Sequence, residues 1–301
     1  MSKQLSRRDF IKKSLGAAGL VTVAASPLVL FNRVRAGEDS PPEATAHGTR
    51  RAWSMVIDLK KCEGCVTIDS PPQCTQACIA GHYIPKGQEW IQVFEVDMPG
   101  GGSFFMPTPC FHCEAAPCVN VCPVAATYHT DEGVVLIDQM RCIGCRFCMA
   151  ACPYQRRFFN WGEPDIPPEA LFAVYSPETQ VPAIRGTVMK CDFCPDMLRK
   201  GSLPYCVTGC PMKALYMGDL SEDKATNGVD VVRLSTFLDQ GNAYRYKAEL
   251  GTQPRVWFLP GHGQDFGRLP DDKRPFQPPQ WSWGGDGYDY KLDVFPWGKG
   301  K

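Results

Sequence analysis

Sixteen cysteines are the residues of this 301-residue chain best suited to chemistry, and they fall into four compact groups with none left over. In chain order these quartets one to four are Cys62, Cys65, Cys74 and Cys78; Cys110, Cys113, Cys118 and Cys122; Cys142, Cys145, Cys148 and Cys152; and Cys191, Cys194, Cys206 and Cys210. Cysteine thiolates hold iron–sulfur clusters, and four of them serve one [4Fe–4S] cluster. The sequence therefore predicts four [4Fe–4S] clusters with these sixteen cysteines as iron ligands.

Quartet three has the most specific spacing. Two residues separate Cys142 from Cys145 and Cys145 from Cys148, and three residues separate Cys148 from Cys152, which precedes Pro153. This is the bacterial ferredoxin run, in which the fourth cysteine ligates the other cluster of a two-cluster protein. Zinc sites favour two cysteine pairs separated by a longer stretch, and disulfide frameworks belong mostly to small domains without a core. The spacing favours iron–sulfur clusters over both.

An internal repeat indicates how the quartets pair. Quartets one and three each follow an Ile-Asp pair and three further residues, whereas quartets two and four each end in Cys-Val-x-x-Cys-Pro before an alanine-containing segment. Quartets two and three have the order of a two-cluster ferredoxin and are joined by a predicted turn at 131–133 and a strand at 134–137. Quartets one and four have the reverse order. We infer a nested pairing, two with three and one with four.

Exchange of the fourth ligand within each pair defines four ligand sets. They are the Cys62 set (Cys62, Cys65, Cys74, Cys210), the Cys191 set (Cys191, Cys194, Cys206, Cys78), the Cys110 set (Cys110, Cys113, Cys118, Cys152) and the Cys142 set (Cys142, Cys145, Cys148, Cys122). The predicted fold class is α+β and loop-rich, with two pseudo-symmetric two-cluster ferredoxin-like units, one inserted in the other.

Quartet one departs from the ferredoxin spacing. Eight residues separate Cys65 from Cys74, and Ile79 stands where the other quartets suggest proline after Cys78. A longer loop between ligands is tolerable because loop-closure entropy grows slowly with length. Whether Cys62, Cys65 and Cys74 hold a standard cubane is left open by the sequence.

The N-terminus has the features of a twin-arginine export signal. Arg7 and Arg8 precede a modest apolar stretch at 14–31, and Ala36 ends a candidate cleavage site. A retained membrane anchor is the alternative, but the stretch is barely long enough and contains Gly16 and Pro27. We expect a folded, cluster-loaded protein to work in the periplasm, and whether the signal is removed stays open.

Charge and composition limit the classes of partner molecule and the type of fold expected for this chain. Without residues 1–36 the chain keeps 25 basic and 31 acidic residues, a net charge of about −6, which argues against nucleic acid as a partner. The 28 glycines and 27 prolines predict a loop-rich fold. The sequence offers no convincing pairing of a nucleophile with a base, so no catalytic residue is predicted.

The histidines indicate a binding site less clearly than the cysteines do. His112 lies between Cys110 and Cys113, where it could donate a hydrogen bond to a cluster or be a surface residue. The others, which have no ligand spacing in this interpretation, are His47, His82, His129 and His262.

The expected organisation follows the quartets. It comprises a signal peptide (1–36), a linker (37–52), an outer ferredoxin-like unit (53–98 with 180–260), an inner ferredoxin-like unit (99–162), a proline-rich excursion (163–179) and an aromatic- and proline-rich tail (261–301). Within the outer unit, residues 231–250 could include an amphipathic helix with Leu234, Phe237 and Leu238 on one face. The tail either clamps a partner subunit or packs on its own domain.

The quartets, the twin-arginine signal and the segment Glu-Leu-Gly-Thr-Gln-Pro-Arg-Val-Trp-Phe-Leu at 249–259 resemble a known family. It is the four-cluster electron-transfer subunit of dimethyl-sulfoxide-reductase-type molybdopterin oxidoreductases, with tetrathionate and polysulfide reductase subunits and the iron–sulfur part of alternative complex III as relatives. The resemblance covers residues 53–260. It implies a relay between a molybdopterin-containing catalytic subunit and an integral-membrane quinone-interacting subunit, with membrane association through that partner. A free-standing soluble polyferredoxin is the alternative function.

Overall fold

The computed structural model describes residues 51–98 and 101–261. The expected signal peptide, most of the linker and the tail beyond Gly261 lie outside the described residues. Among the helices of the described part, none is long and apolar enough to cross a membrane.

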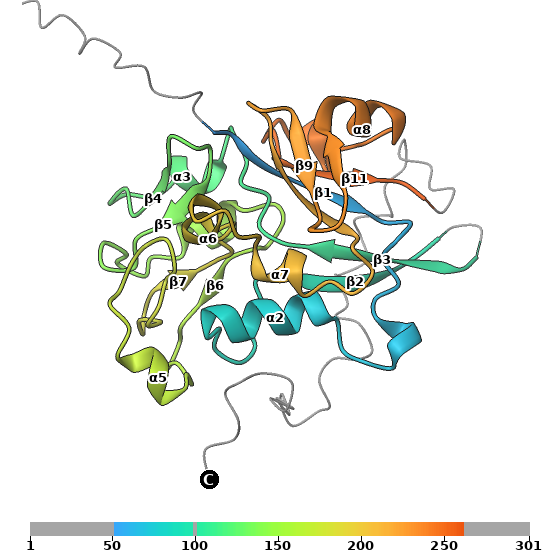
Figure 1. The fold of residues 1–301 in the computed structure, drawn as a ribbon. Helices are drawn as coiled ribbons and strands as arrows, with labels where there is room; N and C mark the ends of the chain where they lie inside the picture. The colour runs from blue at the N-terminus through green and yellow to red at the C-terminus, as the bar shows by residue number, and fades with distance from the viewer. Residues whose placement is uncertain (1–50, 99–100, 262–301) are drawn as a thin grey trace, which may run out of the picture. The chain divides into compact units, whose positions relative to one another are not determined.

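Short elements joined by long loops form a mixed α+β fold (Figure 1), which agrees with the predicted fold class and with the loop-rich character that the composition predicted. The strands are β1 (Trp53–Asp58), β2 (Gln92–Asp97), β3 (Ser103–Thr108), β4 (Thr127–His129), β5 (Val135–Ile137), β6 (Phe158–Phe159), β7 (Val188–Met189), β8 (Leu215–Asp219), β9 (Lys224–Thr226), β10 (Val231–Arg233) and β11 (Val256–Leu259). The helices are α2 (Gln73–His82), α3 (Pro117–Asn120), α4 (Phe147–Ala151), α5 (Pro168–Leu171), α6 (Pro195–Arg199), α7 (Tyr205–Thr208), α8 (Leu234–Gln240) and the 3₁₀ turns η1 (Val66–Ile68) and η2 (Ala248–Leu250).

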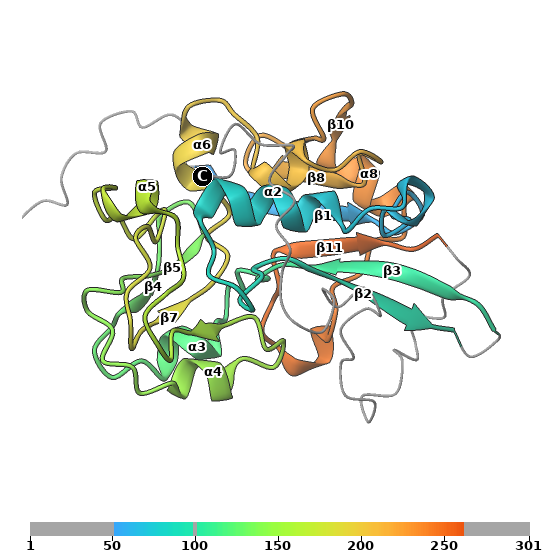
Figure 2. The ribbon, with the colours of Figure 1, turned by 90° about the horizontal axis from the view of Figure 1, so that it is seen from below.

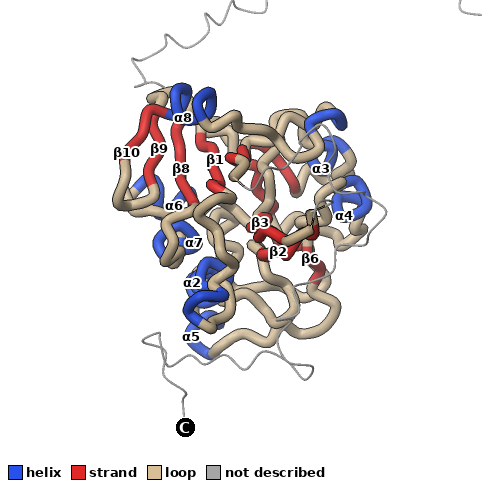
Figure 3. The backbone as a smooth tube through the Cα atoms, turned by 90° about the vertical axis from the view of Figure 1, so that its right-hand side faces the viewer, coloured by secondary structure: helices blue, strands red, loops and turns tan. Residues whose placement is uncertain are grey.

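A five-stranded sheet in the order β10-β9-β8-β1-β11 is the largest element (Figure 3). Strand β1 lies between β8, antiparallel, and β11, parallel. Its alternating side chains are buried on both faces: Val56 belongs to a small core with Leu234 of α8, whereas Met55 and Ile57 belong to the main core that contains most of the cysteines. The sheet therefore anchors the cysteine loops on one side only.

Three two-stranded sheets complete the fold: β2–β3, β4–β5 and β6–β7. The predicted turn and strand after quartet two are confirmed by the β4–β5 hairpin, with Gly133 at φ 78° in the turn. In Figure 2 this hairpin lies with α3 and α4, opposite β1, β8 and β11. The expected boundary at 98 and 99 falls between the paired strands β2 and β3.

Two places in the fold share one hydrogen-bond pattern. The Asp138 N–H donates to the Ala126 carbonyl over 2.8 Å, and the Asp58 N–H donates to the Ala214 carbonyl over the same distance. Each bond closes one end of an antiparallel strand pair, β4 with β5 and β8 with β1. The sequence repeat therefore has a counterpart in backbone pairing.

The amphipathic helix expected within 231–250 is confirmed but short. Residues 231–233 form β10 instead, because their β-branched valines pair with β9, and Gly241 follows the last residue of α8. Leu234 is buried, with Phe237 and Leu238 packed against the same core. The proline-rich excursion contains the short helix α5.

Candidate metal centres

The sixteen cysteines all lie in described residues, and none forms a disulfide. Eleven are buried and five are partly buried. Burial raises the pKa of Cys62, Cys113 and Cys206 to about 12, because a thiolate loses solvation in the protein interior. Bound iron would displace these protons and compensate the thiolate charge. The sulfur-only donors and their burial fit iron–sulfur clusters.

The first Cys-x-x-Cys loop of each quartet turns through a left-handed residue directly before its second cysteine. The four residues and their φ angles are Gly64 (60°), His112 (42°), Gly144 (70°) and Phe193 (65°). Glycine adopts this conformation without strain, but histidine and phenylalanine do not. The His112 and Phe193 rings stack on each other at 3.8 Å between centroids. Ring stacking therefore offsets part of the strain and joins the loops of quartets two and four.

Helix α2 presents three side chains on one face at intervals of four residues. Cys74, Cys78 and His82 are all buried because residues four apart lie above one another on a helix. The insertion before Cys74 contains η1, and Gln73, the first residue of the helix, donates its N–H to Cys65 Sγ over 3.4 Å. A single helix can thus supply ligands to two neighbouring sites.

The long loop of quartet one does not separate its cysteines. One small cavity is lined by Cys62, Cys65, Cys74 and Cys210 together. The Cys62 and Cys65 thiols also interact electrostatically with Cys210. The fold thus brings the four members of the Cys62 set together across a large sequence separation.

The other thiols gather in a similar way. Cys194 interacts electrostatically with Cys78, Cys191 and Cys206, which are the other members of the Cys191 set. Cys113 interacts with the other members of the Cys110 set, Cys110, Cys118 and Cys152. In the Cys142 set, Cys148 interacts with Cys142. The placement of Cys122 in that set stays a prediction.

Electrostatic interactions between thiols of different sets link the sets in one series. Cys74 interacts with Cys206, Cys191 with Cys110, and Cys148 with Cys118. The resulting order is the Cys62 set, the Cys191 set, the Cys110 set and the Cys142 set. Four of the five partly buried cysteines lie in the two end sets, at Cys62, Cys122, Cys142 and Cys145. The fifth, Cys152, belongs to the Cys110 set, and all four members of the Cys191 set are buried.

Three buried cations accompany the thiols: Arg156, Arg157 and Lys190. Burial acts to lower the pKa of Arg157, but the neighbouring Cys118 and Cys148 outweigh it and raise that pKa. Burying a charge without a partner is expensive. The cations therefore fit a site that carries negative charge when its thiolates bind iron. Sequence reasoning missed them, although Lys190 directly precedes Cys191.

At the ends of quartets two and four, the residue after the Cys-Pro-x-x run supplies a hydrogen bond to sulfur. Ala126 N–H donates to Cys122 Sγ over 3.2 Å, and Ala214 N–H donates to Cys210 Sγ over 3.4 Å. These are the alanines that the sequence repeat has in common. Hydrogen bonds to sulfur favour the thiolate and tune a bound cluster.

Two histidine interpretations change. His112 is completely buried, so a surface position is excluded, and Nδ1 accepts the Val135 N–H over 3.0 Å. Burial lowers the pKa of His112 well below its ordinary value, which leaves a neutral ring with its proton on Nε2. His82, for which the sequence indicated no ligand spacing, lies beside a proposed iron ligand: its Nε2 is 3.2 Å from Cys194 Sγ. Its distance of four residues from Cys78 could have revealed it.

Part of the chain matches a family of known proteins. Residues 102–166, which hold quartets two and three, match a family described as a 4Fe-4S dicluster domain. This match and the buried sulfur-only ligand sets define the chain as an iron–sulfur protein.

Three relatives extend the similarity beyond this domain. The chain is 36% identical to a selenate reductase subunit of Mesobacillus selenatarsenatis over 86% of this chain and 98% of that protein. It is 32% identical to a tetrathionate reductase subunit of Salmonella typhimurium over 84% and 88% of the two chains. It is 34% identical to the iron-sulfur cluster-binding subunit of menaquinone reductase from Nitratidesulfovibrio vulgaris, over 69% of this chain and 88% of that protein.

With similarity over nearly the whole length of such subunits, the chain belongs to the iron–sulfur electron-transfer subunits of dimethyl-sulfoxide-reductase-type molybdopterin oxidoreductases. Its function is electron transfer within a reductase complex of several subunits.

Proposed function

We propose that this chain relays electrons through four [4Fe–4S] clusters, held by the Cys62, Cys191, Cys110 and Cys142 sets in that order. The single observation that carries the proposal is the series of thiol neighbours, Cys74 with Cys206, Cys191 with Cys110, and Cys118 with Cys148. Adjacent sets that share close thiols support an unbroken path from one end of the chain's core to the other.

When bound, the clusters accept and release single electrons. The chain's own residues prepare the sites. Tight turns at Gly64 and Gly144 bring pairs of thiols together, and Arg157 offsets the charge of neighbouring thiolates. The stacked rings of His112 and Phe193 exclude water between the two central sets. Seven of the eight cysteines in the two central sets are buried, which favours electron exchange with outside partners at the ends of the series.

The proposed architecture is two ferredoxin-like units, the inner one carrying quartets two and three and the outer one carrying quartets one and four. It is supported by the matching hydrogen bonds of Asp138 to Ala126 and of Asp58 to Ala214, and by the matching N–H···S bonds at Cys122 and Cys210. In this architecture one unit is inserted in a permuted copy of itself.

The proposed partners are a molybdopterin-containing catalytic subunit and an integral-membrane quinone-interacting subunit. The names of two relatives, a subunit of selenate reductase and the iron-sulfur subunit of menaquinone reductase, support a catalytic and a quinone partner respectively. Together with the twin-arginine sequence at Arg7 and Arg8, this supports a periplasmic complex held at the membrane through its partner.

Metal analysis of the complex purified at native expression tests the proposal. We expect about sixteen irons and sixteen sulfides per chain, from four clusters of four irons, and molybdenum that co-elutes with the chain. Zinc in place of iron would refute the cluster assignment. A loaded chain that purifies alone, without molybdenum or any other subunit, would instead identify a soluble polyferredoxin.

A further inference from the structure

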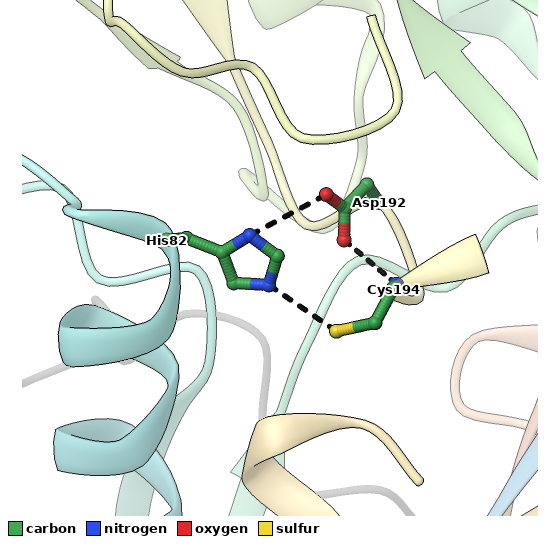
Figure 4. A group of neighbouring side chains, drawn as sticks. All are labelled: His82, Asp192 and Cys194. Atoms are coloured by element: carbon green, nitrogen blue, oxygen red, sulfur yellow. Dashed lines mark hydrogen bonds and ion pairs between the residues drawn. The ribbon is translucent and has the colours of Figure 1, made fainter. Parts of the chain in front are cut away.

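A buried aspartate, histidine and cysteine form a connected group beside the Cys191 set (Figure 4). His82, at the last residue of α2, places Nε2 3.2 Å from Cys194 Sγ and Nδ1 3.6 Å from Asp192 Oδ2. The other carboxylate oxygen of Asp192 accepts the Cys194 N–H over 2.8 Å. In the order His82, Asp192 and Cys194, the three residues are 3%, 0% and 4% exposed.

The aromatic neighbours fix the imidazole in this position. The Trp90 ring lies 4.6 Å from the His82 ring and Tyr205 packs edge-on at 5.2 Å. Gly81 allows this approach, because a Cβ there would meet the Tyr205 ring. The His82 ring is therefore packed against aromatic rings in a water-poor environment.

The chemistry of the acceptors determines where the protons lie. A cysteine that ligates iron is a thiolate and only accepts hydrogen bonds, so His82 Nε2 must carry a proton toward Cys194 Sγ. Asp192 Oδ2 lies 3.6 Å from Nδ1, so the carboxylate faces the ring nitrogen that points away from the sulfur.

Since the Asp192 carboxylate already accepts the Cys194 N–H, that amide points at the carboxylate. His82 is therefore the side chain that supplies a hydrogen bond to this sulfur.

We propose that Asp192 and His82 are positioning residues that hold an N–H···S hydrogen bond on Cys194 and thereby raise the reduction potential of the cluster bound by the Cys191 set. Reduction adds negative charge that spreads over the sulfurs, and an N–H dipole aimed at a sulfur stabilises the reduced state more than the oxidised one. The inference rests on the proposed function, because it requires a cluster at this set. In this inference, the cluster at the second position of the series has its reduction potential tuned by His82 of α2.

The test is a redox titration of the purified complex, followed by electron paramagnetic resonance, for the native chain and two variants. His82→Phe keeps an aromatic ring but removes the donor, and we expect one midpoint potential to fall by about 59 mV, a tenfold loss for a one-electron couple. His82→Gln keeps an N–H donor at the same reach and should restore most of that shift. The control, His129→Phe on β4, should leave all potentials unchanged.

The outcomes separate this inference from the proposed function. A full set of cluster signals with an unmoved midpoint in His82→Phe, or an equal fall in both His82 variants, overturns the inference alone. Absence of the iron and of the cluster signals from the native complex overturns the proposed function instead.

A direct measurement covers the case in which His82→Phe fails to fold. Pulsed electron paramagnetic resonance on the native complex labelled with ¹⁵N-histidine should detect a weak ¹⁵N coupling to one cluster. This coupling should be absent from the His82→Gln complex. A spectrum without a coupling that depends on His82 would contradict the inference.

Discussion

Cys152 follows Cys148 by four residues, yet its thiol interacts electrostatically with Cys110 of the preceding quartet. The Cys-Pro step explains this separation. Helix α4 ends at Ala151, and Cys152 is extended at φ −80° and ψ 109°, because the residue before a proline avoids the helical conformation. The side chain is thereby directed away from its own quartet.

Replacing Cys152 tests the exchange of ligands. In Cys152→Ser we expect the cluster bound by Cys110, Cys113 and Cys118 to be lost or converted, with the iron content falling by about one to four atoms per chain. Electron paramagnetic resonance should lose the signal that is also lost in the matched variant Cys113→Ser. If Cys152→Ser instead reproduces the spectrum of Cys145→Ser, the ligand stays within its own quartet.

At the scale of elements, the close packing of α2 against α7 positions ligands for two sets. Cys74 and Cys78 come from α2 and Cys206 from α7, and the two short helices lie side by side (Figures 1 and 3). Gly209, directly after α7, allows the approach, because a Cβ there would overlap the Ala77 side chain. Helix spacing and ligand position are therefore coupled.

Gly209→Ala should push these helices apart. We expect a loss of about 1–3 kcal/mol in stability from overpacking, measured by thermal unfolding, together with a lower iron content. The double variant with Ala77→Gly should recover most of both losses because it removes the opposing methyl group. Gly162→Ala, where an added Cβ meets open space, is the control. A Gly209→Ala protein as stable as this control would show that the helices are not tightly constrained.

Across the whole described core, exposed apolar side chains accompany the partly buried end of the Cys142 set. Ile143, Phe147 and Trp161 are 64%, 61% and 70% exposed, and the Arg146 guanidinium lies 4.5 Å from the Trp161 ring centroid. A cavity of about 450 Å³ opens beside Trp161. Exposed apolar patches of this kind are typical of protein interfaces. An electron partner that approached here would reach the least buried thiols.

Ile143→Glu should weaken attachment of the subunit that docks at this end. We expect about a tenfold loss of affinity, about 1.4 kcal/mol, with iron content unchanged, measured by titrating the isolated partner. The matched control is Val231→Glu on β10, where a valine is 75% exposed on the sheet edge. Equal effects of the two variants would place the interface elsewhere.

Much of the cofactor chemistry could be predicted from the chain alone because ligand spacing is a local property. The loop from Cys142 to Cys152 contains its own turn and helix start, so it identifies a ferredoxin-type site without knowledge of the fold. The β4–β5 hairpin was predictable for the same reason, since its turn at Gly133 and its valines are contiguous in sequence. Local residues also predicted α8, but not its bounds, because strand pairing with β9 takes residues 231–233.

The amino-acid sequence by itself determined the sulfur donors, their number and the class of electron-transfer subunit, because these depend on residue types and short spacings. Only the tertiary structure decided that Cys62, Cys65 and Cys74 line one cavity with Cys210, that Cys191 interacts electrostatically with Cys110, and that Asp192, His82 and Cys194 meet. Most of those contacts join residues far apart in the chain, and no local pattern encodes which buried side chains a packed core brings together.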